Sequence, residues 1–308
     1  MGYESFIKNI IKIKHKDGIH CPDCNSENIY KHGKYRGRQR YICKDCSKSF
    51  NDLTGTILSG THNINKWIGF LDIMQERNTL RETSKKLGIA HTTIFYWRHK
   101  MLRSLNYDDK KKYDGLVEVF QHPYPLIDKN PTHHYQDRRM KTCQSLDAGD
   151  AFFPRFCNKV SFILTYEPNG RIVSNILEDR ARDSKYLDYF KSRMGKNNTF
   201  CLWFEAPLSY VLKKESRKNK NIKVYSRNDA ELLFNANHAF KFYRSYLSWQ
   251  NDFKGVSTKY LTDYIAWYKN LTNFNFTKSA TNSYELIKET FKSEEKITNW
   301  SVCLSNML

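Results

Sequence analysis

The chain has 308 residues and a formal net charge of +19 at pH 7, from 51 Lys and Arg against 32 Asp and Glu. This length allows a sizeable core, which excludes a small stapled peptide and predicts two or three domains. A surface this basic attracts polyanions, so nucleic acid is the expected partner and a membrane surface is the weaker alternative. No apolar run long enough to span a bilayer occurs in the sequence, so we expect no membrane span and an intracellular, cytoplasmic protein.

Two cysteine pairs follow near the start, Cys21-Pro-Asp-Cys24 and Cys43-Lys-Asp-Cys46. Two C-x-x-C turns separated by roughly 18 residues are typical of a structural zinc site. Four thiolates fill the tetrahedral shell of Zn²⁺ and leave no position for a substrate. The alternative is a redox-active C-x-x-C, but that motif needs one pair beside a βαβ pattern. We therefore predict that Cys21, Cys24, Cys43 and Cys46 bind one structural zinc ion.

The segment between the cysteine pairs has two β-prone stretches around a Gly-centred basic turn, the layout of a zinc ribbon. Positive side chains on this turn can contact phosphates, and Tyr35 and Tyr41 can pack over the ribbon or stack on a sugar or base. A solvated loop is the alternative interpretation. The candidate DNA-binding residues here are Lys34, Arg36, Arg38 and Arg40.

Residues 64–105 predict helices. The apolar face of the first consists of Trp67, Phe70, Leu71 and Met74. A capping box of Thr79 and Glu82 begins the next helix, and Gly88 ends it.

A short helix, a Gly turn and a basic second helix form the helix-turn-helix pattern, whose second helix enters the major groove. The second helix is expected to bury Ile94, Trp97 and Met101 and to expose His91, Thr92, Phe95, Arg98 and Lys100. Helices that merely pack together are the alternative. The candidate DNA-binding residues on the second helix are His91, Thr92, Thr93, Phe95, Arg98 and Lys100.

A polar charged run at residues 106–112 predicts a linker to a larger region. There the patterns predict a strand at 116–120, a hairpin at 159–177, a helix at 184–194, a strand at 199–204 and a mostly helical stretch at 230–271. This order predicts a mixed α/β domain. The expected divisions are a zinc ribbon with an N-terminal helix (1–55), a helix-turn-helix region with linker (56–113), the α/β domain (114–275) and a helical tail (276–308).

Four segments together resemble the zinc-ribbon DDE insertion-sequence transposases, the bacterial group related to eukaryotic Merlin elements. They are CPDC…RQRYICKDCSKSFNDLTGTILSGTHNINKW, LRETSKKLGIAHTTIFYWRHKML, GLVEV and FKGVSTKYLTDYIAWYKNL, in the family's order over roughly residues 15–271. The resemblance implies an RNase H-like domain in which three carboxylate-type residues hold two Mg²⁺ ions for DNA cleavage and strand transfer. It also implies an N-terminal half that binds terminal inverted repeats of double-stranded DNA, and a homo-oligomer.

The chain departs from this family at the catalytic positions. The first aspartate of the family follows the strand as Glu-Val-Asp-Glu, where this chain has Phe120, which cannot bind Mg²⁺. Glu205 is the one retained acidic candidate, at the second position. Near the third position stand Asn235, Asn237, His238 and Lys241, although an ungapped match places Ala239 there.

Three interpretations follow from this departure. The favoured one is a transposase-family DNA-binding protein, a pseudoenzyme whose Mg²⁺-dependent chemistry is impaired or lost. The second is an active transposase that uses displaced carboxylates, such as Glu118, Asp128 or Asp147 together with Glu205. The third is a zinc-ribbon and helix-turn-helix transcriptional regulator.

Overall fold

The computed structural model describes residues 2–76, 78–106, 111–125, 159–178, 183–203, 207–235, 237–253, 256–273 and 280–292. They belong to two compact units, which are treated separately below. The first unit comprises Met1–Asp108 and Ala266–Leu308, and the second comprises Asp109–Ile265. Within the described ranges, every helix is too short or too polar to cross a membrane.

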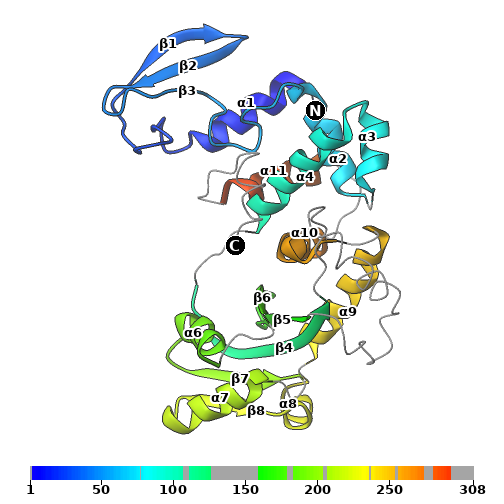
Figure 1. The fold of residues 1–308 in the computed structure, drawn as a ribbon. Coiled ribbons are helices and arrows are strands. Elements are labelled where there is room, and N and C mark those ends of the chain that lie inside the picture. The colour runs from blue at the N-terminus through cyan, green and yellow to red at the C-terminus, as the bar shows by residue number, and fades with distance from the viewer. Residues whose placement is uncertain are drawn as a thin grey trace, which may run out of the picture. The chain divides into compact units, whose positions relative to one another are not determined.

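The first unit begins with helix α1 (Tyr3–Lys14), which leads into a three-stranded antiparallel sheet (Figure 1). The strands are β1 (Ile29–Tyr35), β2 (Arg38–Cys43) and β3 (Ser49–Asn51), in the order β1-β2-β3. Tyr41 and Phe50 stack across β2 and β3 with ring centroids 5.4 Å apart. They share a small core with the buried Cys21 and Cys43, so the cysteines are an integral part of this layer.

Three helices follow the ribbon: α2 (Trp67–Met74), preceded by the 3-10 turn η1 (Ile64–Lys66), α3 (Leu80–Leu87) and α4 (His91–Leu105). The predicted apolar face of α2 is fully buried, and Trp67 stacks on Trp97 of α4 with centroids 4.8 Å apart. The capping box of Thr79 and Glu82 is present, and Gly88 ends α3 in the left-handed region at φ 59°.

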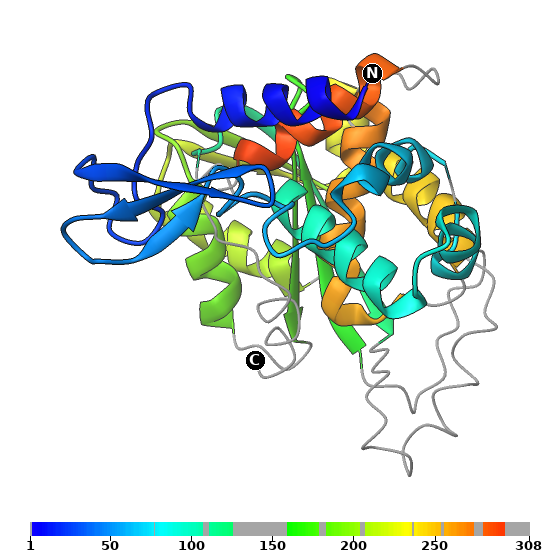
Figure 2. The same cartoon turned by 90° about the horizontal axis from the view of Figure 1, so that it is seen from above.

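The C-terminal part of the chain completes this first unit. It contains the end of α10 (Leu261–Asn273), α11 (Ala280–Glu289) and the turn η6 (Thr290–Lys292). Helix α11 packs on α2, and η6 packs on α4 (Figure 2). The indole of Trp267 donates a hydrogen bond to the carbonyl of Met74 at 3.1 Å. The helical core around α4 is therefore built from both ends of the sequence.

The second unit contains a five-stranded mixed sheet in the order β6-β5-β4-β7-β8. Strand β5 (Lys159–Tyr166) runs antiparallel to both β4 (Gly115–Pro125) and β6 (Ile172–Glu178). Strands β4, β7 (Asn198–Leu202) and β8 (Ile222–Tyr225) are parallel. The helices are α6 (Asp183–Arg193), α7 (Pro207–Lys218), α8 (Arg227–Phe234) and α9 (His238–Gln250), with the turns η4 (Asn251–Phe253) and η5 (Thr258–Tyr260). The predicted mixed α/β class is confirmed.

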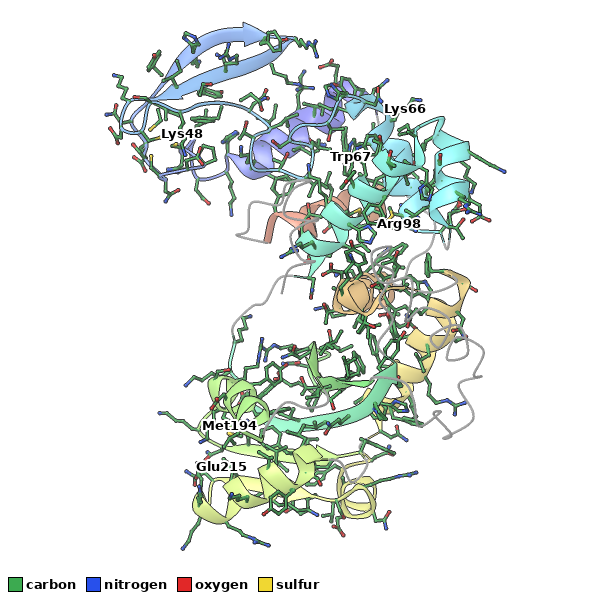
Figure 3. All side chains as sticks on the ribbon, in the orientation of Figure 1. Lys48, Lys66, Trp67, Arg98, Met194 and Glu215 are labelled. Carbon is green, nitrogen blue, oxygen red and sulfur yellow. The ribbon has the colours of Figure 1, made fainter. Side chains whose placement is uncertain are left out.

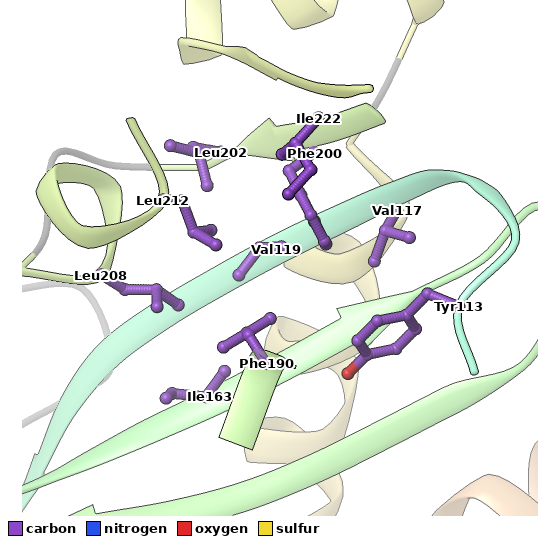
Figure 4. Packing of buried hydrophobic residues seen from close by; sticks show 10 residues of the cluster. All are labelled: Tyr113, Val117, Val119, Ile163, Phe190, Phe200, Leu202, Leu208, Leu212 and Ile222. Carbon is purple, nitrogen blue, oxygen red and sulfur yellow. The ribbon is translucent and has the colours of Figure 1, made fainter. Parts of the chain in front are cut away.

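The central strand β4 sends alternate side chains to opposite faces of this sheet, as a regular strand must. Val117 and Val119 lie on one face, in a core with Phe190 of α6 and Leu212 of α7 (Figure 4). Glu118 and Phe120 lie on the other face, where they meet α9. This alternation decides which residues of β4 can take part in chemistry beside α9.

The mostly helical stretch predicted from residue 230 consists of separate helices. Helix α8 ends at Phe234, and Asn235 adopts a left-handed φ of 48° before α9 begins at His238. Asparagine tolerates this conformation better than most residues. The break places the start of α9 directly against β4.

Candidate functional site

The four predicted cysteines converge on one point. Their sulfur atoms all lie within 4.8 Å of one another, with Cys21 and Cys46 3.5 Å apart and Cys24 and Cys43 also 3.5 Å apart. Tetrahedral Zn²⁺ with Zn–S bonds of about 2.3 Å places its sulfurs roughly 3.8 Å apart. The donor set and its spacing therefore fit a closed structural zinc site.

The two cysteine turns share one backbone conformation. The residue after each second cysteine, Asn25 and Ser47, has a left-handed φ of 59°. These turns aim backbone N–H groups at the sulfurs. Burial opposes ionisation of Cys21, but N–H donors from Cys24 and Asp23 outweigh it and lower the pKa of the Cys21 thiol to about 7. A thiolate is the form that binds zinc, so these donors favour the zinc-binding form of Cys21. The pKa of the Cys24 thiol moves the other way: a backbone N–H donor lowers it, but desolvation and hydrogen bonds to the other three cysteines outweigh that donor and raise it to about 12.

The tip of the ribbon is a two-residue hairpin turn. Tyr35 pairs with Arg38, and the two residues between them, Arg36 and Gly37, have φ values of 49° and 76°. Positive φ at both central positions defines a type I′ turn, which favours Asn-Gly or Gly-Gly. Arg36 thus holds a conformation that arginine rarely adopts, and its guanidinium lies over the ring of Tyr35, 5.3 Å from the centroid. A strained cation at an exposed tip suggests a function.

The remaining candidates on the ribbon differ in exposure. Lys34 and Arg36 are exposed, whereas Arg38 and Arg40 are half-buried, and Arg38 donates a hydrogen bond to the hydroxyl of Tyr3 at 2.8 Å. Tyr35 is 59% exposed but Tyr41 is buried. Tyr41 therefore belongs to the ribbon core, and Tyr35 is the tyrosine of this pair that can reach a ligand. Lys48 lies at the cysteine end of the ribbon (Figure 3).

The candidate DNA-binding residues of α4 differ in exposure along the helix. His91 and Thr92 are exposed, and Thr93 and Phe95 are half-buried. Ile94, Trp97 and Met101 are buried as predicted.

The predicted exposure of Arg98 is wrong. Its side chain is buried, donates hydrogen bonds to Asn78 O at 2.8 Å and Thr83 Oγ1 at 3.2 Å, and lies over the ring of Trp267 (Figure 3). Trp267 lies about 170 residues further along the chain than Arg98. The periodicity of α4 alone therefore cannot predict that Trp267 covers Arg98. Arg98 thus connects α4 to α3 and α10 and is not exposed for contact with DNA.

The predicted exposure of Lys100 is also wrong. The side chain is only 2% exposed, and its ammonium group donates a hydrogen bond to the carbonyl of Ser59 at 2.7 Å. Burial lowers the pKa of Lys100 to about 8, because a charged amine loses its hydration there.

Lys100→Met is expected to stabilise the protein at pH 7, by roughly 1–3 kcal/mol, because it removes a buried charge. The pKa of Lys100 is about 8 in the folded state and 10.5 in the unfolded state. Between these pH values the unfolded state binds more protons, so the free energy of unfolding of the wild type increases as the pH rises. The advantage of the variant should shrink over that window in urea unfolding at several pH values. Lys85→Met, at an exposed site on α3, is the control. A difference that stays constant with pH contradicts a desolvated Lys100.

In the second unit, the residue predicted to replace the first catalytic aspartate, Phe120, is a packed aromatic side chain. Phe120 is fully buried and lies 4.7 Å from the ring of Tyr243 and 5.8 Å from that of Phe240, both on α9. Trp203, just past β7, donates its backbone N–H to Val119 O and stacks on Phe240 with centroids 5.6 Å apart. Aromatic rings fill the space between β4, the end of β7 and α9.

Glu118, on the same face of the sheet as Phe120, has a structural role. Its carboxylate accepts a hydrogen bond from Nδ1 of His238 at 2.7 Å and another from the backbone N–H of Ala239 at 2.9 Å. The two donors lie at the start of α9, where backbone N–H groups lack helical partners and favour negative charge. The ring of His238 also stacks on Tyr166 with centroids 5.1 Å apart. Glu118 is 3% exposed and acts as a helix cap.

The other catalytic candidates divide into two groups. Glu205, Asp128 and Asp147 lie outside the described residues. Near α9, Asn235 and Lys241 are exposed, and Ala239 is buried beneath Glu118. The pairing of Glu118 with His238 was not predicted from the sequence. Two features of the sequence could have indicated this pairing. A glutamate stands two residues before Phe120, on the same face of the strand, and a histidine stands where a helix begins.

The cysteine cluster on a three-stranded sheet defines a zinc-ribbon protein. Residues 18–47 match the InsA N-terminal domain, a zinc-ribbon family. Insertion element iso-IS1N protein InsA of Shigella dysenteriae is 32% identical over 77 residues, 25% of this chain and 82% of that protein. The chain belongs to the insertion-element protein family that carries this ribbon.

A second relative is a protein in transposable element ISH50 of Halobacterium salinarum. It is 29% identical over 112 residues, which is 36% of this chain and 38% of that protein. The chain thus spans well under half the length of this relative. Among solved structures, similarity is found to a Mos1 strand transfer complex, at 12% identity and a TM-score of 0.31 over 73% of this chain and 75% of that one. A pre-cleavage Mos1 transpososome gives 11% identity and a TM-score of 0.24, over 72% and 78%.

Proposed function

We propose that this chain is a DNA-binding protein of an insertion element. It recognises the terminal inverted repeats through the zinc ribbon and through the first turn of α4. Helices α3 and α4 together form a helix-turn-helix. The observation that carries the proposal is the ribbon tip, where Lys34 and Arg36 are exposed and Arg36 adopts a conformation that asparagine or glycine would hold at lower cost. His91 and Thr92, exposed at the start of α4, are placed to meet base edges.

We further propose that the second unit is an RNase H-like domain with impaired or lost Mg²⁺-dependent strand transfer. The strand order β6-β5-β4-β7-β8, with β5 antiparallel to the central strand, supports the RNase H-like assignment. Impaired chemistry is supported by the ring of Phe120 where the family has an aspartate, and by Glu118, whose oxygens are held by His238 and Ala239. Mg²⁺ needs carboxylate oxygens that remain free to bind it.

Arg36→Asn tests DNA recognition without weakening the ribbon. Asparagine suits the left-handed turn better than arginine, so the fold should be retained or stabilised while one phosphate contact is lost. We expect Lys34→Gln combined with Arg36→Asn to weaken binding to a terminal inverted-repeat duplex by about 10-fold or more, with a smaller salt dependence. Binding is measured by fluorescence anisotropy at several salt concentrations.

Lys44→Gln is the matched control, because Lys44 is exposed on the same ribbon at its cysteine end. It should change affinity far less than the exchange at the tip. Equal losses from both variants would contradict a role for the tip. Incubation of a labelled inverted-repeat duplex with Mg²⁺ tests the second part, and strand cleavage by the purified protein would favour an active transposase with displaced carboxylates.

A transcriptional regulator is the competing function, since it would use the same ribbon and helices. The two are separated by the DNA sequence that is bound. Selection from random duplexes should enrich the ends of the insertion element if the proposal holds. Enrichment of promoter sequences unrelated to those ends would favour the regulator.

A further inference from the structure

The aromatic cluster beside α9 is bounded by two arginines. The guanidinium of Arg227 lies over the ring of Trp203, 5.0 Å from its centroid. The guanidinium of Arg244 lies over the ring of Phe240 at 5.9 Å. Trp203 and Phe240 stack on each other with an interplanar angle of 11°. The two stacked rings thus each carry an arginine guanidinium over them.

This stack lies where three elements of the second unit meet. Trp203 follows β7, Phe240 and Arg244 belong to α9, and Arg227 begins α8. Phe120, at the first catalytic position of the family, contacts Phe240 from β4. Both arginines are exposed, whereas Trp203 is 3% exposed. Phe240 is half-buried. The guanidinium groups are therefore the parts of this cluster most open to a ligand.

Arg227 and Arg244 would bind phosphate in a different way from a metal site. Carboxylates bind phosphate only through a divalent cation, whereas a guanidinium binds phosphate oxygens directly and often with two hydrogen bonds. An aromatic face beneath each guanidinium limits its rotation and prepares it for such a contact. The centroid distances bound the separation of the two cations at about 17 Å. Both cations can therefore contact one strand within about five nucleotides, at roughly 3.4 Å per nucleotide.

We propose that Arg227 and Arg244 form a second contact site for DNA, which binds the phosphate backbone without a metal ion. The site rests on the proposed DNA-binding function and adds a sequence-independent contact on the second unit. The aromatic side chains position the guanidinium groups and make no contact with the bases. This side of the sheet, beside α9, thus keeps an affinity for phosphodiesters although Phe120 replaces a metal ligand.

The test uses the full zinc-loaded chain and a 30-bp duplex of random sequence in buffer without Mg²⁺. Arg227→Gln with Arg244→Gln should lower the slope of log K against log salt by about 1 to 2, and weaken binding about 10-fold or more at low salt. Arg227→Lys with Arg244→Lys should restore most of the slope, because charge is retained. The matched control is Arg217→Gln with Lys218→Gln, two exposed cations on α7.

Any of the following results would overturn the inference. An unchanged slope in the glutamine variant, or an equal decrease in the α7 control, shows that these arginines do not contact DNA specifically. A lower melting temperature with unchanged binding shows that the stack serves only the fold. If the exchange of Lys34 and Arg36 weakens binding while that of Arg227 and Arg244 does not, the proposed function stands and this inference fails. If the wild type binds no DNA, both fail.

Discussion

Removal of zinc is expected to unfold residues 18–54 and leave the five-stranded sheet of the second unit folded. The ribbon has a core of only a few side chains around Tyr41 and Phe50, so most of its stability must come from the metal. Structural zinc sites contribute about 10–16 kcal/mol of apparent binding free energy in small domains. Metal analysis should give one zinc per chain. After chelation, limited proteolysis should cut within the ribbon, and binding to inverted-repeat DNA should be lost.

Cys24→Ser is expected to reproduce the effect of chelation, because it removes one of four ligands from a closed shell. Cys201→Ala is the matched control, since Cys201 is a buried thiol in the second unit. Burial raises its pKa to about 12, so it remains a neutral thiol at pH 7. The prediction is wrong if the Cys24 variant keeps one equivalent of zinc and a protease-resistant ribbon.

Glu118→Ala is expected to destabilise the second unit by about 3 kcal/mol, because it leaves a buried backbone N–H without a hydrogen-bond acceptor. Ala239 donates that N–H to Glu118 at 2.9 Å, and the side chain of Ala239 is fully buried. His238 loses its partner as well. The loss should be visible in urea unfolding followed by circular dichroism. Glu118→Gln keeps one acceptor and should lose less.

Two comparisons decide between this structural role and metal binding. Glu215→Gln removes a carboxylate that lies 3.8 Å from Lys191 on the opposite side of the sheet, and it should change stability by no more than about 0.5 kcal/mol. A ligand that binds only the folded state raises its melting temperature. If Mg²⁺ stabilises the wild type and this effect disappears in Glu118→Ala, then Glu118 is a metal ligand and its assignment as a cap is wrong.

Local patterns in the sequence predicted much of this protein. Cysteine spacing predicted the cluster, the 3,4 spacing from Trp67 predicted the buried face of α2, and Thr79 with Glu82 predicted the start of α3. The helical features depend on residues within about two turns of a helix, and the cluster depends on two short motifs with a recognisable spacing. Such interactions are encoded close together along the chain.

The errors arose where residues distant in sequence meet. Arg98 and Lys100 lie on the polar side of α4 by periodicity, yet Trp267 and the carbonyl of Ser59 cover them. The link between Glu118 and His238 joins positions 120 residues apart. Periodicity reports the faces of one helix and says nothing of a second partner that covers the polar face. Tertiary contacts of this kind cannot be obtained from local patterns.

Because residues from Ala266 onward belong to the first unit, the ribosome finishes that unit last. The helices before residue 108 leave the ribosome first, but Trp267, Leu286 and Ile287 are needed to cover them. At about 5–20 residues per second, translation of the intervening 180 or so residues takes roughly 10–35 seconds. During that time the nascent chain exposes apolar surface of α2 and α4. A copy of the gene interrupted before the codon for Trp267 would therefore produce an incomplete first unit.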